Sequence, residues 1–532
     1  MRHNHLQVLA AASGIIITLT TASAQWTDNP ALNTPAVVAP NDQDVSKVAV
    51  AADGSSWYGW FDFQPGGIQV RVQRLTPDGN QSFASDGLIV STHAQNTFVV
   101  DWDLRTDADG NCMLAFTDTR SGPDTDVYAY LIAPDGTMLW GADGVTISDN
   151  ADFEVDPRII QNSDGDYIVV WPRFDALPGL YMQRLNPAGT PQLAAGGVLI
   201  AGGGTESPAF VEMEPTDLGD FVAVWVRDTS SFFSPRHLHA QRFTAGGSPV
   251  WGATPVVVMS TTVVPIAHKP RILEDHGGMV VGWHDTRDGD FDCYVQRIDS
   301  LGGTVFPANG VAVSVEPARQ QLDPAIALDP SGDIMVFYRN MDGNQNLQGM
   351  NVQRIDSAGS RALGSAGVEL LPFNNQFKGP PQAASIANGV AGITDLQPNS
   401  SVGNFDGLLQ LMRVDSSGAY LDSGPIGVAT TPSGKGRLAM RAAPGGALIA
   451  EWADDRNGNK DVYAQRINAD GSLGGAACAP DLTGDGVLDF FDVQAFLQAF
   501  AAEDAVADFT GDGVFDFFDV QAFLAAFAQG CP

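Results

Sequence analysis

The sequence predicts a mainly β fold, an eight-bladed β-propeller followed by a small α-helical module, from three observations. A strand-turn phrase, seen first as Val72-Gln73-Arg74-Leu75 before Pro77-Asp78-Gly79, occurs eight times. The glycines that close the phrase stand 57, 53, 58, 55, 57, 59 and 53 residues apart, a period typical of radial or linear arrays. Residues 25–475 also lack any long segment of helical periodicity and consist of short apolar runs between turns, which indicates strands.

Each repeat contains four strand segments, the number in one propeller blade. The last repeat ends near Leu473 without its fourth segment, whereas Trp26 to Val38 at the other end of the chain resembles the fourth segment Trp140 to Ile147. We therefore expect the N-terminal strand to complete the last blade and close the ring, which removes two exposed sheet edges. Seven blades is the alternative, because the repeat near 386–395 lacks the aromatic residue that the others provide: Trp60, Phe116, Trp171, Trp225, Trp283, Tyr338 and Trp452.

The residues that recur in every repeat are interpreted as scaffold. The strand phrase carries an Arg in seven of its eight copies, and Asp-x-Arg turns such as Asp285-Thr286-Arg287 precede several of them. One interpretation is that these charged residues form a ring around a funnel that binds a ligand. A residue that recurs with the repeat is, however, expected to pair within the scaffold. Cys112 and Cys293 lie in different repeats and are expected to be buried singly.

The N-terminus predicts export from the cell. Residues 1–24 have a short basic start, an apolar stretch and the A-x-A site Ala22-Ser23-Ala24, which is the pattern of a secretory signal peptide. We expect a secreted, extracellular or cell-surface protein with no membrane span. The net charge of −34 argues against nucleic-acid partners, because phosphate binding requires clustered Lys and Arg.

Two acidic loops near the C-terminus predict binding of two calcium ions. Asp481 to Asp492 and Asp508 to Asp519 repeat one twelve-residue pattern, with oxygen donors at positions 1, 3, 5, 7, 9 and 12 and Gly at position 6. The first loop offers Asp481, Thr483, Asp485, the carbonyl of Val487, Asp489 and Asp492, and the second offers Asp508, Thr510, Asp512, the carbonyl of Val514, Asp516 and Asp519.

A loop followed by a helix, with Asp at position 12 and a second copy 27 residues later, resembles the dockerin type I module of bacterial cellulosomes, which is related to the EF-hand. The resemblance covers about residues 478–532 and implies docking to a cohesin-like partner on a scaffold or cell surface. This sequence departs from the family at positions 10 and 11, where many dockerins have Ser or Thr contacts to the partner. The aromatic pairs Phe490-Phe491 and Phe517-Phe518 stand there and are the candidate partner contacts; the alternative is that their rings fill the small core between the two loops.

Two cysteines, Cys478 and Cys531, bracket this module. In an oxidising compartment a disulfide between them would join the two ends of the module. The sequence thus divides into a signal peptide at 1–24, a propeller at 25–475 built from repeats of about 53–59 residues, and a dockerin-like calcium-binding domain at 476–532.

We find no catalytic motif in the sequence, which contains neither an H-E-x-x-H zinc motif nor a G-x-S-x-G nucleophile elbow. The first hypothesis is a non-catalytic binding or structural propeller that its calcium module docks to an extracellular partner. The alternative is a polysaccharide-degrading enzyme, a glycoside hydrolase or lyase, because dockerins usually ride on such enzymes. A polysaccharide is a possible ligand under either hypothesis.

Overall fold

A computed structural model gives the structure of the chain and describes most of residues 26–529. The described ranges are 26–93, 101–174, 177–204, 206–228, 236–262, 264–265, 269–398, 406–475, 480–483, 488–502, 504–510 and 513–529. The predicted signal peptide and both Cys478 and Cys531 lie outside these residues.

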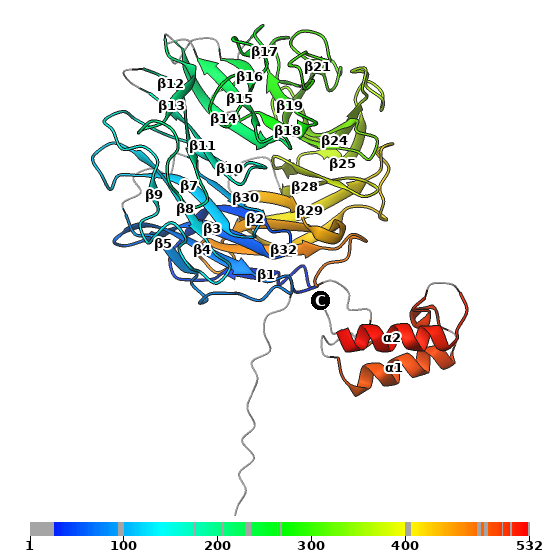
Figure 1. The fold of residues 1–532 in the computed structure, drawn as a ribbon. Helices are drawn as coiled ribbons and strands as arrows, with labels where there is room; N and C mark the ends of the chain where they lie inside the picture. Colours follow the sequence, from blue (N-terminus) through cyan, green and yellow to red (C-terminus); the bar gives the residue numbers. More distant parts are fainter. Residues whose placement is uncertain are drawn as a thin grey trace, which may run out of the picture.

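Antiparallel sheets dominate the described residues and follow one another around a ring (Figure 1). Six sheets have four strands each, and a seventh has eight strands that divide at β30 (Ile426–Ala442) into two four-stranded units. The first half of β30 pairs with the strand before it and the second half pairs with the strand after it. The strand pairing therefore gives eight units, which we number in chain order.

The first three units have the following strands. Unit 1 contains β2 (Gln43–Val50), β3 (Ser56–Gln64), β4 (Gly67–Leu75) and β5 (Leu88–Ser91). Unit 2 contains β6 (Asp103–Thr106), β7 (Cys112–Asp118), β8 (Asp126–Ile132) and β9 (Val145–Thr146). Unit 3 contains β10 (Arg158–Gln161), β11 (Tyr167–Arg173), β12 (Gly179–Leu185) and β13 (Val198–Gly202).

The next three units repeat this order. Unit 4 contains β14 (Ser207–Pro215), β15 (Phe221–Asp228), β16 (His237–Phe243) and β17 (Val256–Met259). Unit 5 contains β18 (Arg271–Asp275), β19 (Gly278–Asp285), β20 (Asp292–Ile298) and β21 (Val311–Ala312). Unit 6 contains β22 (Arg319–Leu328), β23 (Ile334–Asp342), β24 (Gln348–Ile355) and β25 (Val368–Asn374).

The last two units share β30. Unit 7 contains β26 (Phe377–Lys378), β27 (Gln382–Ile386), β28 (Gly389–Gln397), β29 (Asp406–Val414) and the first half of β30. Unit 8 contains the second half of β30, then β31 (Leu448–Asp454), β32 (Asp461–Ile467) and β1 (Thr34–Val37). The first strand of unit 7 is broken in two, so the repeat that lacks the aromatic residue packs irregularly, as its sequence predicts.

The ring is held together by packing between the units. The first strand of each unit contacts the first strand of the next, from β2 through β6, β10, β14, β18, β22, β27 and β30 back to β2. Eight hydrophobic clusters form the core, one between each pair of neighbouring units. The predicted mainly β, propeller-like fold is confirmed, and the ring arises from packed separate sheets.

The N-terminal segment completes unit 8, as predicted. Strand β1 pairs antiparallel with β32, in the register Thr34 to Ala464 and Pro35 to Tyr463. Ahead of it, the indole of Trp26 is buried and its Nε1 donates a hydrogen bond to the carbonyl of Pro77 in unit 1 at 2.9 Å. The start of the chain thus links the last unit to the first.

The recurring residues form the scaffold, as the sequence analysis expects. The seven repeated aromatic side chains are at most 2% exposed. Six of the seven strand-phrase arginines pair with an Asp of their own unit, as Arg242 does with Asp220 and Arg297 with Asp275, both at 2.6 Å, whereas Arg466 donates to Asn468. In the Asp-x-Arg turns, Arg287 pairs with the buried Asp285. Cys112 and Cys293 are buried free thiols.

Two helices follow the ring in sequence. Helix α1 spans Phe490–Ala501 and α2 spans Phe517–Gln529, and short 3-10 turns cover Ala505–Ala507 here and Pro444–Gly446 in unit 8. The helices pack through Phe496 and Phe523, whose rings stack at 4.0 Å. The predicted helical module after the β region is therefore present among the described residues.

We predict that ring stability depends on the N-terminal segment. Deleting residues 25–40 removes the strand that pairs with β32 and exposes the apolar face beneath it, so a lower melting temperature or aggregation is expected. The single change Trp26→Ala should cost about 3–5 kcal/mol, because it empties a buried indole site. Leu32→Ala is the control, since Leu32 is 63% exposed. Equal melting of all three variants and the parent would contradict closure by this segment.

Candidate functional site

A pocket of about 840 Å³ opens where the first strands of the ring begin, and we call it the axial pocket. Residues from β2, β18, β22, β27 and β30 line it, together with residues ahead of β6 and β18. A pocket of this size holds a small ligand or part of a chain. It lies where different units meet, so one site combines side chains that are far apart in sequence.

Cationic side chains outnumber acidic ones in the lining of the axial pocket. Six are cationic and three are acidic: Lys47, Lys269, Arg271, Lys435, Arg437 and Arg441 against Asp101, Asp323 and Asp395. The whole chain has the opposite balance, with 28 Lys and Arg against 62 Asp and Glu. The pocket is therefore a local concentration of positive charge in an acidic protein.

Asp101 is the centre of an ion-pair network at the pocket wall. Lys47 lies 2.6 Å and Arg158 3.0 Å from its carboxylate oxygens, and the Lys269 ammonium donates to it as well. Burial opposes ionisation, but these three cations outweigh it and hold the pKa of Asp101 well below its usual range. Burial and the nearby Arg158 lower the pKa of Lys269.

Asp395, on β28 in the irregular seventh unit, is the acid of the pocket with the opposite behaviour. Its Oδ2 accepts a hydrogen bond from the Gln397 amide at 2.9 Å, and its Oδ1 has no partner among the described residues. Burial raises the pKa of Asp395 to about 6, although Gln397 and Lys435 act in the other direction. One pocket thus contains a carboxylate held ionised and a carboxyl that keeps its proton at weakly acidic pH.

His284 and Lys435 complete the titratable groups of this wall. The His284 ring accepts a hydrogen bond from the backbone N–H of Asp323 at Nδ1, 3.2 Å away, and burial lowers its pKa. The imidazole is therefore neutral near pH 7. Lys435 is almost fully buried and pairs with Asp454 at 3.1 Å, while burial lowers the pKa of its ammonium.

Glu451 lies behind the pocket wall on β31 and is fully buried. In register it stands between Ala439 of β30, which lines the pocket, and Ala464 of β32. Burial raises the pKa of Glu451 to about 8, against the opposing influence of Ser46, Lys47 and Arg441. The side chain is therefore a neutral carboxylic acid at pH 7.

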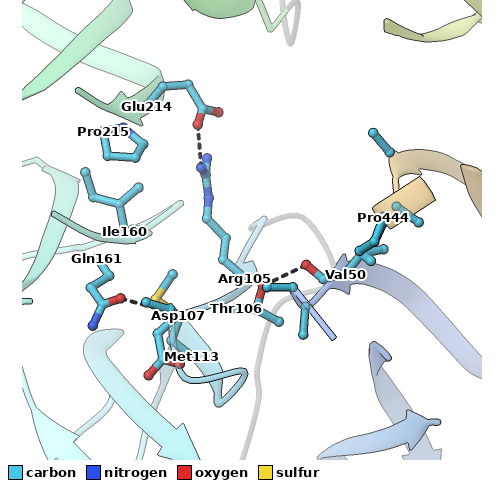
Figure 2. A pocket seen from close by; sticks show the side chains of 15 residues that line it. Val50, Arg105, Thr106, Asp107, Met113, Ile160, Gln161, Glu214, Pro215 and Pro444 are labelled. Atoms are coloured by element: carbon cyan, nitrogen blue, oxygen red, sulfur yellow. Dashed lines mark hydrogen bonds and ion pairs between the residues drawn. The ribbon is translucent and has the colours of Figure 1, made fainter. Parts of the chain in front are cut away.

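A second pocket, of about 550 Å³, lies at the other end of the first strands (Figure 2). The last residues of β2, β6, β10, β14 and β30 line it, and small or apolar side chains such as Val50, Ile160 and Pro444 form much of its wall. Figure 2 shows Arg105 reaching toward Glu214, which it pairs with at 2.8 Å. Its charges are satisfied internally, so the axial pocket is the stronger candidate site.

The described parts of the two predicted calcium loops make the same hydrogen bonds. In the first, the backbone N–H and the hydroxyl of Thr483 donate to Oδ1 of Asp492 at 3.0 and 2.8 Å, and the N–H of Asp489 donates to Oδ2 at 2.9 Å. In the second, Thr510 and Asp516 make the same three contacts to Asp519. Positions 1, 3, 9 and 12 of both loops and Val514 are described.

The remaining predicted ligands, Asp485, Val487 and Asp512, lie outside the described residues. Within the described part of the chain, no group of three or more His, Cys, Asp or Glu side chains is arranged to hold a metal. The all-oxygen donor set and the anchored carboxylates of Asp492 and Asp519 nevertheless fit calcium, which prefers oxygen ligands.

The aromatic pairs after each loop are exposed. Phe490 and Phe491 are 73% and 60% exposed, and Phe517 and Phe518 are 72% and 62% exposed. The core between the helices uses other residues, such as Phe496 and Phe523, so the pairs are not core residues.

Sequence reasoning missed the whole axial pocket. The lining cations are scattered over the chain from Lys47 to Arg441 and share no motif, so only the closed ring brings them together. The indication that the sequence did offer was a departure from the repeat pattern: Asp395 lies in the repeat that lacks the recurring aromatic residue.

Comparison with family models and with curated proteins finds no match. Solved structures with a similar arrangement include an ulvan lyase, at 9% identity and TM-score 0.45, over 85% of this chain and 97% of that one. A second polysaccharide lyase matches at 10% identity and TM-score 0.42, over 81% and 91%. An α-L-arabinanase from Penicillium chrysogenum matches at 14% identity and TM-score 0.33, over 60% and 94%.

No helix in the described residues is long and apolar enough to cross a membrane.

We predict that Glu451 makes stability fall with rising pH. An unfolded Glu ionises near pH 4.3, about the value for a free side chain. The folded state keeps this proton up to about pH 8. Between the two values the folded state binds more protons, so the free energy of unfolding decreases by up to about 1.4 kcal/mol per pH unit.

Glu451→Gln should remove this contribution. Denaturant unfolding of the variant and the parent is measured from pH 5 to about 8. The stability difference should shift steadily in favour of the variant as pH rises. A difference that is constant over this range would show that Glu451 ionises normally in the folded state.

Proposed function

We propose that the protein is a polysaccharide-degrading enzyme that binds its substrate in the axial pocket, with Asp395 as proton donor. The observation that carries the proposal is the divergence of two carboxyl groups in one pocket. The pKa of Asp395 is raised to about 6, whereas that of Asp101 is held well below its usual range. Such divergence is typical of acid/base pairs.

Asp395 has the location and the protonation state required of a general acid. Asp395 lines the pocket, and its Oδ1 is buried without a hydrogen-bond partner among the described residues, which favours the protonated form of the carboxyl. Cleavage of a glycosidic bond requires a proton for the leaving oxygen, and a carboxylic acid of raised pKa supplies it. Gln397 fixes the other carboxyl oxygen and so orients the group.

The polysaccharide class is supported by the C-terminal module. Its paired acidic loops resemble dockerins, whose carriers usually act on polysaccharides. We further propose that the eight units are the blades of an eight-bladed propeller closed by β1, and that the protein is exported through its N-terminal segment. A non-catalytic binding propeller is the second candidate, favoured by the ion pairs that immobilise Asp101 and Asp323.

The Asp395→Asn variant tests the catalytic proposal. Asn cannot donate the proton, so a loss of activity of about 10²–10⁴-fold is expected on a panel of polysaccharides. Parent activity should fall as pH rises through about 6, where Asp395 loses its proton. Reducing ends report hydrolysis or elimination, and ultraviolet absorbance of an unsaturated product reports elimination alone.

Asp53→Asn is the control for this test, because Asp53 pairs with Arg74 in an outer turn, at 2.9 Å. Binding of a polysaccharide without any release of product by the parent protein would favour the non-catalytic candidate.

We also propose that the C-terminal module binds two calcium ions and docks to a cohesin-like partner through its exposed aromatic pairs. Asp492 and Asp519 would hold the ions together with the other oxygen donors of each loop. The charges of the loops repel one another without a cation, so calcium is expected to stabilise the module. Exposed aromatic side chains of this kind typically anchor interfaces.

Calcium should protect the module of the full chain from proteolysis, and chelator should remove the protection. The double variant Asp492→Asn with Asp519→Asn should not respond to calcium. The matched variant Phe490→Ser with Phe517→Ser should keep calcium protection and lose capture by a purified cohesin. Protection that is equal with calcium and with chelator would argue against calcium as part of the fold.

A further inference from the structure

Two arginines of the axial pocket have no carboxylate partner. Among the described residues, Arg271 on β18 makes no hydrogen bond or ion pair, and Arg441 on β30 donates only to the backbone carbonyl of Met440, at 3.0 Å. Both side chains line the axial pocket and are exposed to it.

Every other cation of the pocket lining pairs with a nearby carboxylate. Lys47 and Lys269 pair with Asp101, and Lys435 pairs with Asp454. Arg437 pairs with Asp44 at 3.1 Å. Arg271 and Arg441 are therefore the two cations of the pocket lining without a carboxylate partner among the described residues.

These two guanidinium groups come from units 5 and 8 and influence each other across the ring. Although the Arg441 side chain is exposed to the pocket, burial by the surrounding protein is the largest effect that lowers its pKa; repulsion from Arg105 and Arg271 adds to this effect, and attraction by Glu214 and Asp103 opposes it. Arg105 is itself neutralised by Glu214 and Asp103. Like charges brought together without a counter-ion cost stability, and a bound anion removes that cost.

We propose that Arg271 and Arg441 form an anion subsite of the axial pocket that binds the carboxylate or sulfate group of an acidic saccharide. A planar guanidinium donates two parallel hydrogen bonds to either group, and both groups match its geometry. The inference rests on the proposed action on a polysaccharide and adds the charge class of the substrate. The chemistry shared by uronate and sulfate is what the site recognises, so the experiment separates the two.

Binding to the full chain is measured by calorimetry at low ionic strength, where screening is weak. The small probes are inorganic sulfate and glucuronate, and the polymer probes are dextran, carboxymethyl dextran and dextran sulfate, which share one backbone. We expect charged dextrans to bind and uncharged dextran to bind more weakly. The preferred small probe identifies the group.

Arg271→Gln and Arg441→Gln should each weaken binding of the charged probes by about tenfold or more, because each removes a charge-assisted pair. Arg437→Gln is the matched control: it removes a charge from the same pocket, but one that already pairs with Asp44, so an effect below about threefold is expected. The melting temperature of Arg441→Gln should not fall, since the substitution relieves repulsion.

The outcomes separate this inference from the proposed function. Equal weakening by Arg437→Gln, or unchanged binding in both other variants, overturns the anion subsite. Cleavage of a polysaccharide that does not depend on charge or on these arginines leaves the enzyme proposal standing without the subsite. Arginine-dependent binding of sulfate or glucuronate, with no polymer bound or cleaved, keeps the subsite and overturns the polysaccharide proposal. No binding of any probe overturns the subsite.

Discussion

The pairing of β1 with β32 is the interaction on which the rest of the structure depends. Unit 8 has three strands from the C-terminal repeat, and its fourth comes from the N-terminal segment. Trp26 then donates to Pro77 in the next unit at 2.9 Å. The same indole-to-turn contact joins other units, from Trp140 to Pro187 and from Trp251 to Ser300. Closure therefore uses the ordinary contact between units, and only a closed ring brings distant residues together in the axial pocket.

The residues that recur in the units and the residues that line the axial pocket have different roles. The recurring arginines pair within their own units, and the recurring aromatic side chains fill the clusters between units. Asp395, Arg271 and Arg441 belong to no recurring pattern. The physical reason is geometric: a side chain that supports every unit is needed in every unit, whereas a ligand at the axis is contacted by a few units in different ways.

The sequence predicted the β class, the eight units and the closing strand because each of these depends on local patterns. Turn glycines, alternating apolar residues and a missing final strand are readable one repeat at a time. The pocket could not be predicted, because it depends on which side chains of eight units face one another. The amino-acid composition does not indicate the positive charge of the pocket either, because the six pocket cations belong to a chain with a net charge of −34.

The hydrogen bonds of the C-terminal loops also depend on a local sequence pattern. Asp492 and Asp519 occupy equivalent positions and accept equivalent hydrogen bonds, because each loop folds from twelve consecutive residues. The exposure of Phe490 and Phe517 was not readable, since it depends on how two helices pack.

The acidic surface and the cationic pocket are compatible with one anionic ligand. At physiological ionic strength, the effect of surface charges is screened beyond about 8 Å. The electrostatic potential in the pocket is therefore set mainly by the cations that line it. Glu451, behind the pocket wall, is neutral at pH 7 because burial raises its pKa to about 8, and it therefore adds no negative charge to the wall. A neutral acid and an uncompensated cation in one wall both cost stability, and such costs are typical of functional sites. The pocket wall thus leaves its positive charge available to a ligand.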